Sequence, residues 1–375
     1  MKTIYEDMGL QRVINACGRM TALGVSAIHN EVAEVLVKAA QNYVVIDELM
    51  DKTGELISIY TGGEDSCVTV CASAGIMIAA AACIAGDNWN CIKKLPDSTG
   101  MKNEILIQKG HAVNFGASIT QMLRMGGAVP VECGQVNLVT REELETAVTE
   151  QTAALLYCKS HHCMQKGMLS VEVMAEIAHN HGLPLIVDAA AEEDLHVYLN
   201  KGADLVIYSG AKAFEGPTSG FITGRADLIK KCKMQYQGVG RVAKIGKEGM
   251  TGLVKALELY SKKDEKREQK RQQELVGKIL EDLKEFPFIQ GEMSRDDAQR
   301  LIYRARMKFT PDSPMTAQTV MEKLKEGNPA VYVRGHEAQS GVLYIDPRSI
   351  SEEDVKSIIN KLRAVLKEDA QDKGE

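Results

Sequence analysis

Short apolar runs alternate with longer amphipathic stretches over most of residues 61–258. Each run is rich in apolar or β-branched residues, which predicts a buried strand, and the stretches between the runs have the periodicity of helices. The predicted strands lie at residues 67–71, 104–108, 129–132, 153–158, 184–188 and 205–209. Strands and helices that alternate in this way predict an α/β fold with a parallel, doubly wound sheet. Binding sites in such folds lie at the carboxyl ends of the strands.

Two further regions surround this predicted sheet. The chain begins as an irregular arm and continues from about residue 31 as a helix that stops at Gly62 and Gly63. A long helical stretch from about residue 253 to residue 286 has the heavily charged middle SKKDEKREQKRQQE and connects to the second domain. We therefore predict an N-terminal arm and helix (1–60), a large domain (61–258) and a small C-terminal α+β domain (259–375).

The stretch 205–224, LVIYSGAKAFEGPTSGFITG, places Lys212 just after a buried strand and beside a glycine-rich turn. Burial lowers the pKa of a lysine, and a neutral amine forms a Schiff base with an aldehyde. Taken alone, an S-G-x-K segment is more often a solvated loop, and Lys212 would then be a surface lysine. The motif becomes more informative when it is combined with a second strand end upstream.

That second strand is PLIVDAAA, which ends in Asp188, 24 residues before Lys212. Pyridoxal phosphate is an electron sink only while its ring nitrogen stays protonated, and an acidic partner at a strand end supplies that condition. A strand ending in Asp, followed by a strand ending in Ser-x-x-Lys, is the order found in the aspartate-aminotransferase fold family. On its own, Asp188 would also suit a helix cap or a metal ligand.

Three other polar residues follow predicted strand ends: Ser73, His111 and Ser160. The segment ASAG at 72–75 opens a helix, and small residues with a serine at a helix N-terminus let backbone N–H groups bind an anion. An ordinary N-cap is the alternative for Ser73, and a polar loop histidine is the alternative for His111. Together with Asp188 and Lys212, these residues predict one site at the carboxyl edge of the sheet.

Composition narrows the class of protein. The 375 residues are 45% hydrophobic and 26% charged, and the net charge of −6 does not favour nucleic-acid binding. The longest apolar run, at 72–85, is too short to span a membrane, and the N-terminus does not resemble a signal peptide. Nine scattered cysteines without a C-x-x-C pair favour reduced thiols in the cytoplasm over a disulfide framework or a zinc site, so no metal is expected.

Four segments carry a resemblance to a known family. YSGAKAFEGPTSGFI resembles the lysine segment of the selenocysteine synthase (L-seryl-tRNA selenium transferase) group of pyridoxal-phosphate enzymes, and RVINACGRMTALG resembles the opening of its catalytic core. GASITQMLRMGGAVPVECGQVN and VLYIDPRSI are similar to its central segment and small-domain strand. Within the group the chain looks most similar to the D-glucosaminate-6-phosphate ammonia-lyases. The resemblance implies an aspartate-aminotransferase-like fold (pyridoxal-phosphate fold type I).

The resemblance also implies roles for individual residues. Lys212 would bind the cofactor covalently, Asp188 would hold the pyridinium nitrogen, and His111 would stack on the ring. Ser73, Ala74, Gly75 and Ser209 would hold the cofactor phosphate, with Thr218 reaching in from a neighbouring subunit. The residues expected to bind an anionic, amino-acid-like substrate are Arg241, Lys244, Arg348 and Arg19. His161 and His162 follow a strand end and would line the pocket or lie on the surface.

The implied activity is a pyridoxal-phosphate-dependent α,β-elimination. An ammonia-lyase of this group would convert D-glucosaminate 6-phosphate into 2-keto-3-deoxy-6-phosphogluconate and ammonia. Alternatives are another enzyme with the same core (an aldolase, a racemase, or a selenium or sulfur transferase) and a non-catalytic binding protein. Because the core motif begins by residue 12, we expect no tRNA-binding domain before it, and we expect at least a homodimer.

Overall fold

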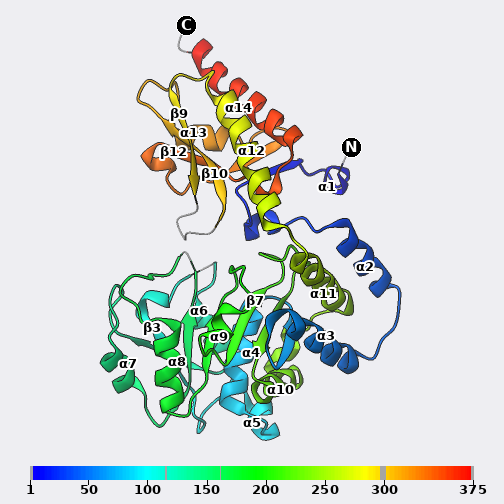
Figure 1. The fold of residues 1–375 in the computed structure, drawn as a ribbon, viewed down its shortest axis with the longest axis vertical. Coiled ribbons are helices and arrows are strands. Elements are labelled where there is room, and N and C mark those ends of the chain that lie inside the picture. The colour runs from blue at the N-terminus through cyan, green and yellow to red at the C-terminus, as the bar shows by residue number, and fades with distance from the viewer. Residues whose placement is uncertain (1–2, 115, 161, 296–300, 373–375) are drawn as a thin grey trace. The chain divides into compact units, whose positions relative to one another are not determined.

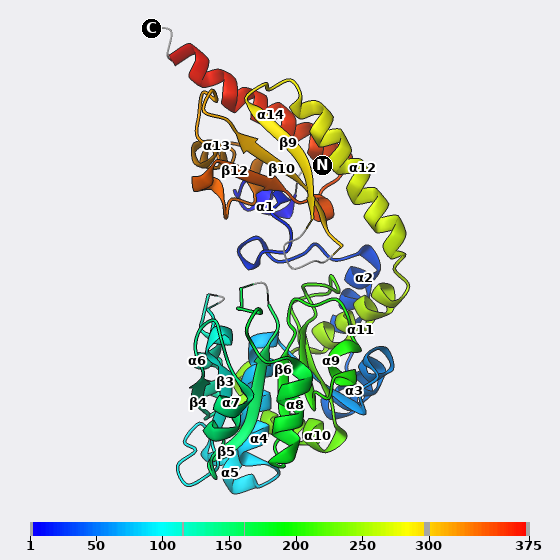
Figure 2. The same ribbon diagram turned by 60° about the vertical axis from the view of Figure 1, so that its left-hand side comes forward.

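The computed structural model describes residues 3–114, 116–160, 162–295 and 301–372. The chain divides into two compact units (Figures 1 and 2). The large unit is Ile28–Lys262, and the small unit combines Met1–Ala27 with Lys263–Glu375. The N-terminal 27 residues therefore belong to the same unit as the C-terminal part of the chain.

A seven-stranded sheet forms the centre of the large unit. In spatial order its strands are β2 (Asp65–Thr69), β8 (Gly220–Gly224), β7 (Leu205–Ser209), β6 (Leu185–Asp188), β5 (Thr152–Cys158), β3 (Glu104–Gln108) and β4 (Val129–Cys133). Strand β8 is antiparallel to both of its neighbours, and the pairs from β7 to β4 are parallel. The predicted, mostly parallel α/β sheet is confirmed.

Helices cover both faces of this sheet, which explains why its strands are nearly continuous apolar runs. Because side chains alternate along a strand, Ile105 and Ile107 pack with helix α4 on one face, and Leu106 packs with helix α8 on the other. The helices of the large unit are α2 (Asn30–Ala40), α3 (Ile46–Thr61), α4 (Ala72–Ala85), α5 (Trp89–Lys94), α6 (Ile119–Met125), α7 (Arg141–Ala147), α8 (Val171–Asn180), α9 (Val197–Asn200), α10 (Ala226–Met234) and α11 (Lys247–Ser261).

Helix α4 packs closely on the sheet, and its small side chains allow this approach. A Cβ atom added to Gly75 would lie 2.8 Å from Ile207 Cγ2 of β7. Alanines such as Ala79 and Ala80, both fully buried, continue the same helix. The close packing brings the N-terminus of α4 next to the strand ends that carry the candidate site residues.

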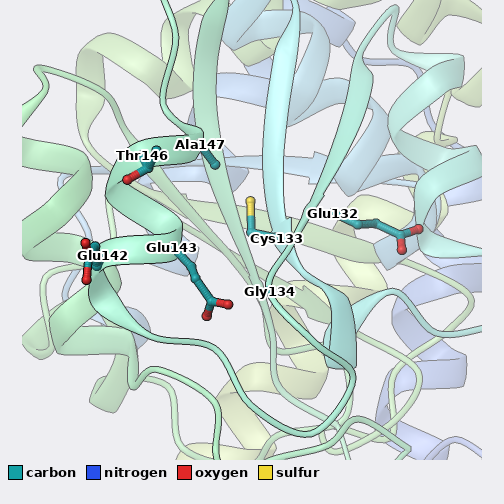
Figure 3. A pocket seen from close by; sticks show the side chains of 7 residues that line it. All are labelled: Glu132, Cys133, Gly134, Glu142, Glu143, Thr146 and Ala147. Carbon is teal, nitrogen blue, oxygen red and sulfur yellow. The ribbon is translucent and has the colours of Figure 1, made fainter.

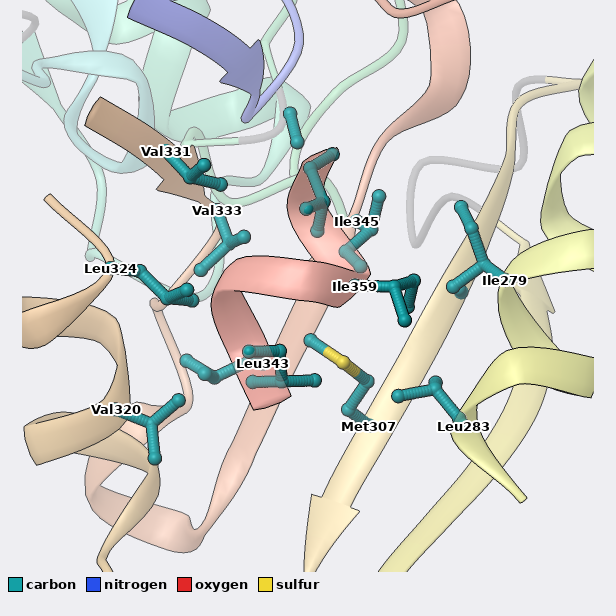
Figure 4. Close-up of a cluster of buried hydrophobic side chains, with 14 of the residues drawn as sticks. Ile279, Leu283, Met307, Val320, Leu324, Val331, Val333, Leu343, Ile345 and Ile359 are labelled. Atoms are coloured by element: carbon teal, nitrogen blue, oxygen red, sulfur yellow. The ribbon is translucent and has the colours of Figure 1, made fainter. Parts of the chain in front are cut away.

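The small unit contains two sheets and its own apolar core. Strand β1 (Val13–Ala16) pairs in parallel with β11 (Ala330–Val333), and an antiparallel sheet has the order β12 (Val342–Ile345), β10 (Tyr303–Phe309), β9 (Ile289–Arg295). Its helices are α1 (Ile4–Asp7), α12 (Glu265–Leu283), α13 (Ala317–Lys323) and α14 (Glu352–Asp372). Side chains from both sheets and from α12, α13 and α14 form this core (Figure 4).

Two predicted helices are each split into two. The stretch 31–60 contains α2 and α3 with a break at 41–45, and the stretch 253–286 lies across α11 and α12. After the second break, Asp264 is the N-cap of α12, because its side chain accepts a hydrogen bond from the Arg267 N–H at 3.0 Å. Among the described residues, none of the helices combines the length and the hydropathy that a membrane span needs.

Candidate active site

Asp188 ends strand β6 and is buried, with only 4% of its surface exposed. The Ala190 N–H donates to its Oδ1 atom at 3.1 Å, and the Cys158 thiol donates to Oδ2 at 3.5 Å. Burial raises the pKa of Asp188 above its usual value, while the Ala190 N–H, the positive charge of Lys212 and the Cys158 thiol act in the opposite direction. A buried carboxylate in this setting suits a cationic partner such as a pyridinium N–H.

Lys212 lies in the turn that follows the neighbouring strand β7. Its N–H donates to the Ser209 carbonyl at 3.4 Å, and the Gly216 N–H closes the turn on the Gly210 carbonyl at 2.9 Å. The side chain is partly exposed, and its charge acts on buried Asp188. Strand pairing places Asp188 beside Ile207, so the lysine and the carboxylate come from adjacent strand ends. The roles that the sequence predicts for Lys212 and Asp188 toward a cofactor stay predictions.

His111 follows β3 and is completely buried. The Cys158 N–H donates to its Nδ1 atom at 3.3 Å, and its Nε2 atom lies 3.1 Å from the Met164 carbonyl oxygen. Because a carbonyl only accepts, Nε2 carries the proton and the ring is neutral. Burial lowers the pKa of His111 to about 4. Since the ring is fully covered here, its stacking on a cofactor stays a prediction.

The N-terminus of helix α4 carries the predicted phosphate-binding residues. Ser73 is exposed in the first turn, and Cys71 caps the helix by accepting from the Ala74 N–H at 3.4 Å. The first N–H groups of a helix have no intrahelical partner and favour an anion. A Cβ atom on Gly220 would lie 2.7 Å from the Ala72 nitrogen, so glycine lets β8 approach this turn.

Ser209 is buried at the end of β7 and pairs with Gly220. Ser209 is therefore separated from the first turn of α4 by a single strand, β8. A phosphate bound at this turn would lie near the strand ends of Asp188 and Lys212. The structure thus offers residues that fit all three parts of pyridoxal phosphate: its aldehyde, its ring nitrogen and its phosphate.

The other predicted site residues of the large unit have no described contact with Asp188 or Lys212. Thr218 is exposed in the turn between β7 and β8. Arg241 and Lys244 are exposed at and just after the short helix Val239–Ala243, and no described contact joins them to Lys212. Ser160 is buried, and its hydroxyl accepts from the N–H of exposed His162 at 3.2 Å; His161 lies outside the described residues.

The remaining two predicted arginines belong to the small unit. Arg348 forms a two-pronged ion pair with buried Asp346, with Nε to Oδ1 at 2.9 Å and the second nitrogen to Oδ2 at 2.8 Å. Arg19 is partly exposed and follows Gly18, whose added Cβ atom would lie 2.7 Å from the Arg348 guanidinium. The N-terminal arm therefore packs directly on the Asp346–Arg348 pair.

Cys158 was missed as a site residue because its sequence context suggests only a small buried hydrophobe. It ends β5, where strand pairing sets it directly beside Asp188. Its backbone contacts His111 and its thiol contacts Asp188. The available signal was positional: the strand run 153–158 ends on this residue, as the neighbouring strand ends on Asp188.

A separate cavity lies between β4 and α7 at the edge of the sheet (Figure 3). It has a volume of about 530 Å³, and its lining includes the acidic residues Glu132, Glu142 and Glu143. None of the predicted site residues lines this cavity. Its carboxylates would repel an anionic substrate, so the strand-end site is the better candidate for catalysis.

Comparisons with known proteins agree with this geometry. Residues 13–298 match the family model described as SelA: L-seryl-tRNA selenium transferase. A D-glucosaminate-6-phosphate ammonia lyase from Salmonella typhimurium is 47% identical over 96% of this chain and 97% of its own length. A 5'-C-glycyluridine monooxygenase-decarboxylase from Streptomyces sp is 36% identical over 96% of this chain and 92% of its own.

Solved structures give the same picture. The structure of a D-glucosaminate-6-phosphate ammonia-lyase superimposes with a TM-score of 0.94 at 46% identity, covering 99% of this chain and 100% of that one. Aspartate aminotransferase from Thermus thermophilus, at 18% identity, covers 96% of this chain and 94% of its own with a TM-score of 0.53, which supports the shared fold. The chain therefore belongs to the L-seryl-tRNA selenium transferase family and is a pyridoxal-phosphate-dependent lyase of fold type I.

Proposed function

We propose that this lyase acts on D-glucosaminate 6-phosphate and releases 2-keto-3-deoxy-6-phosphogluconate and ammonia. The observation that carries the proposal is the pairing of buried Asp188 with the charge of Lys212 at adjacent strand ends. The choice of substrate is supported by the relative of that name, which is 47% identical over nearly the whole of both chains. Elimination of the β-hydroxyl followed by hydrolysis balances the reaction, because the water lost in the first step returns in the second.

The chain's own residues divide the work of this reaction. Bound pyridoxal phosphate supplies an electron sink that makes the α-proton of an amino acid acidic. Asp188 keeps a proton on the ring nitrogen, and Lys212 anchors the cofactor and then takes the α-proton as general base. The first N–H groups of α4, with Ser73, Ala74, Gly75 and Ser209, hold the cofactor phosphate.

The substrate has two anionic ends, a carboxylate and a phosphate, and we assign them to basic residues. The candidates are Arg241, Lys244, Arg348 and Arg19, because a guanidinium binds either group through two hydrogen bonds and an ammonium attracts either group as a point charge. Arg348 is held rigid by Asp346, so its direction is set before any ligand arrives. A rigid arginine loses less side-chain entropy when it binds an anion.

The working form in this proposal is a homodimer or a larger oligomer in the cytoplasm, with Thr218 of one subunit reaching the phosphate of its neighbour. The connection between α2 and α3 supports an oligomer, because Tyr43 is fully exposed and Val44, Val45 and Ile46 are each more than 40% exposed. The nine cysteines are scattered without a C-x-x-C pair, which favours a reducing compartment.

The function is tested by incubating the purified full-length chain with D-glucosaminate 6-phosphate and measuring keto acid and ammonia together. We expect both products in equal amounts. Lys212→Ala should abolish them together with the visible absorption band of the bound cofactor. Inversion of the configuration at the α-carbon without release of ammonia would instead indicate a racemase. Release of an aldehyde would indicate an aldolase. Either result would overturn the proposed reaction.

A further inference from the structure

We propose that Cys158 is a positioning residue of the cofactor site, whose thiol orients Asp188 toward the pyridinium nitrogen. The inference rests on the role proposed above for Asp188 and does not depend on the identity of the substrate. It assigns a function to a thiol that otherwise looks like one of several small buried side chains in the sheet.

The contact follows from strand pairing. In the parallel ladder of β5 and β6, Leu155 lies beside Leu185 and Cys158 lies beside Asp188. Residues that are direct neighbours in a ladder project to the same face of the sheet. The Cys158 Sγ atom reaches Asp188 Oδ2 at 3.5 Å, and Cys158 itself is completely buried. Backbone pairing therefore fixes the donor and the acceptor in place.

The backbone N–H of Cys158 also has a hydrogen-bond partner. The Cys158 N–H donates to His111 Nδ1 at 3.3 Å, and His111 Nε2 contacts the Met164 carbonyl at 3.1 Å. Rotating β5 or shifting its register would leave a buried ring nitrogen without a partner, which costs free energy. The position of the thiol is thus fixed independently of Asp188.

A fixed donor matters because Asp188 has few others. Among the described contacts, its side-chain oxygens accept from the Ala190 N–H and from the Cys158 thiol. Each oxygen thereby has one protein donor, and each keeps further lone pairs for a ligand. Removing the thiol would free Oδ2 to rotate and would disfavour the charged carboxylate that a pyridinium needs.

The thiol is suited to remain a donor. Contact with the Cys163 thiol, burial and the Asp188 charge all raise the pKa of Cys158 well above its ordinary value. These influences favour the protonated thiol, which is the form that can donate to Asp188. A thiolate next to Asp188 would instead repel the carboxylate.

The test compares two cofactors on the full-length chain stripped of ligand: pyridoxal phosphate, and its 1-deaza analogue, which carries C–H in place of the ring nitrogen. Because a thiol is a weak donor, the loss of its hydrogen bond predicts that Cys158→Ala weakens binding of pyridoxal phosphate roughly five- to tenfold. Binding of the deaza analogue should change less than about twofold, because the analogue gives Asp188 nothing to hold. Cys158→Ser, which keeps a donor, should restore most of the affinity for pyridoxal phosphate.

Cys67→Ala provides the matched control. Cys67 is completely buried in β2 of the same sheet, and its thiol contacts the Val68 carbonyl rather than a site residue. We expect it to leave the ratio of the two affinities unchanged. If Cys158→Ala does not fold, Cys158→Val repeats the test, since valine fills the space without offering a donor.

Two outcomes would overturn the inference: equal losses for both cofactors in Cys158→Ala, or the same change of ratio in Cys67→Ala. In an Asp188→Asn background, Cys158→Ala should add no further loss of pyridoxal phosphate, and a full additional loss would also contradict it. These measurements use no substrate. A failure to release keto acid would therefore count against the proposed substrate alone.

Discussion

His111 is held at both ring nitrogens by backbone groups, which fixes its charge as well as its orientation. An unfolded histidine has a pKa near 6.5, whereas burial lowers the pKa of folded His111 to about 4. Between these values the unfolded chain binds more protons than the folded chain, so stability must fall as the pH falls from about 6.5 to about 4. The full loss from this one residue is about 3 kcal/mol.

We therefore predict that His111→Asn flattens the pH dependence of unfolding in that window. The measurement is urea unfolding of the variant and the unmodified chain at pH 7, 5.5 and 4.5. His181→Asn, at an exposed position after α8, controls for the loss of a histidine as such. Parallel pH curves for His111→Asn and the unmodified chain would refute the assignment of a buried neutral ring.

Asp346 presents the opposite case, a buried carboxylate kept charged. Burial alone would raise its pKa, but the guanidinium groups of Arg348 and Arg304 lower the pKa of Asp346 to about 2. Arg304 Nε lies 3.0 Å from Oδ2, and Arg304 is only 4% exposed. The charged Asp346 carboxylate therefore stabilises the folded chain above pH 4, and this contribution is lost as the pH falls toward 2.

Removing the Asp346 carboxylate takes a buried ion-pair partner away from the guanidinium groups of Arg304 and Arg348. We predict that Asp346→Ala destabilises the chain by about 3–5 kcal/mol, measured by urea unfolding at pH 7. Glu55→Gln removes the acid from the exposed Lys52–Glu55 pair and should cost less than about 1 kcal/mol. Similar costs for the two variants would mean that the buried pair contributes no more than a surface one.

Individual site residues could be predicted from sequence to different degrees. Lys212 and Asp188 each follow an apolar run, so their places at strand ends were readable without coordinates. Cys158 was not, because its role depends on the register between β5 and β6, which no local pattern encodes. The second arginine on Asp346 was also hidden, since Arg304 comes from a strand some forty residues earlier in the sequence.

Among the elements, helix α4 shows how one residue type sets a packing distance. Gly75 faces β7 so closely that an added methyl group would lie 2.8 Å from Ile207, whereas nothing lies within 4 Å of the corresponding position on Gly277 in α12. Both glycines lie within a helix, Gly75 in the first turn of α4 and Gly277 in the middle of α12. The space available for a side chain differs between the two positions.

The same substitution at these two glycines should therefore have opposite effects. Gly75→Ala forces a clash and should destabilise the ligand-free chain by about 1–3 kcal/mol. Gly277→Ala relieves the entropy cost of a helical glycine and should stabilise the chain by up to about 1 kcal/mol. Thermal unfolding of both variants gives the comparison. A stabilising Gly75→Ala would show that α4 does not pack as described.

Elements buried on two sides were the easiest to predict. Short apolar runs with flanking turns mark the strands of the central sheet, so all of them except β8 were predicted close to their observed bounds. Strands β1 and β9 were not predicted. The side chains of β9 are mostly exposed along IQGEMSR, and β1 pairs with a strand more than 300 residues away. The breaks at 41–45 and 262–264 were missed because no glycine or proline marks them.

For the whole molecule, the N-terminal segment has a structural role in the small unit. Ile14 and Ala16 are buried in its core, and the Ala16 carbonyl accepts from the Asp346 N–H at 2.9 Å. We predict that deleting residues 1–16 speeds hydrogen exchange in β11 and β12 while β5 and β6 keep their protection. Mass spectrometry of the exchanged peptides would detect this. Unchanged protection of β11 would show that β1 contributes nothing to that sheet.

The placement of β1 also affects how the protein is made. Val13 pairs with Ala330, so the first strand leaves the ribosome long before its partner exists. At roughly 5–20 residues per second, the wait lasts about 15–60 seconds. During that interval Ile28–Lys262 emerges complete and is free to fold, while the small unit must remain unfinished. A nascent chain stalled before residue 330 would therefore expose the unpaired backbone of β1, to which chaperones could bind.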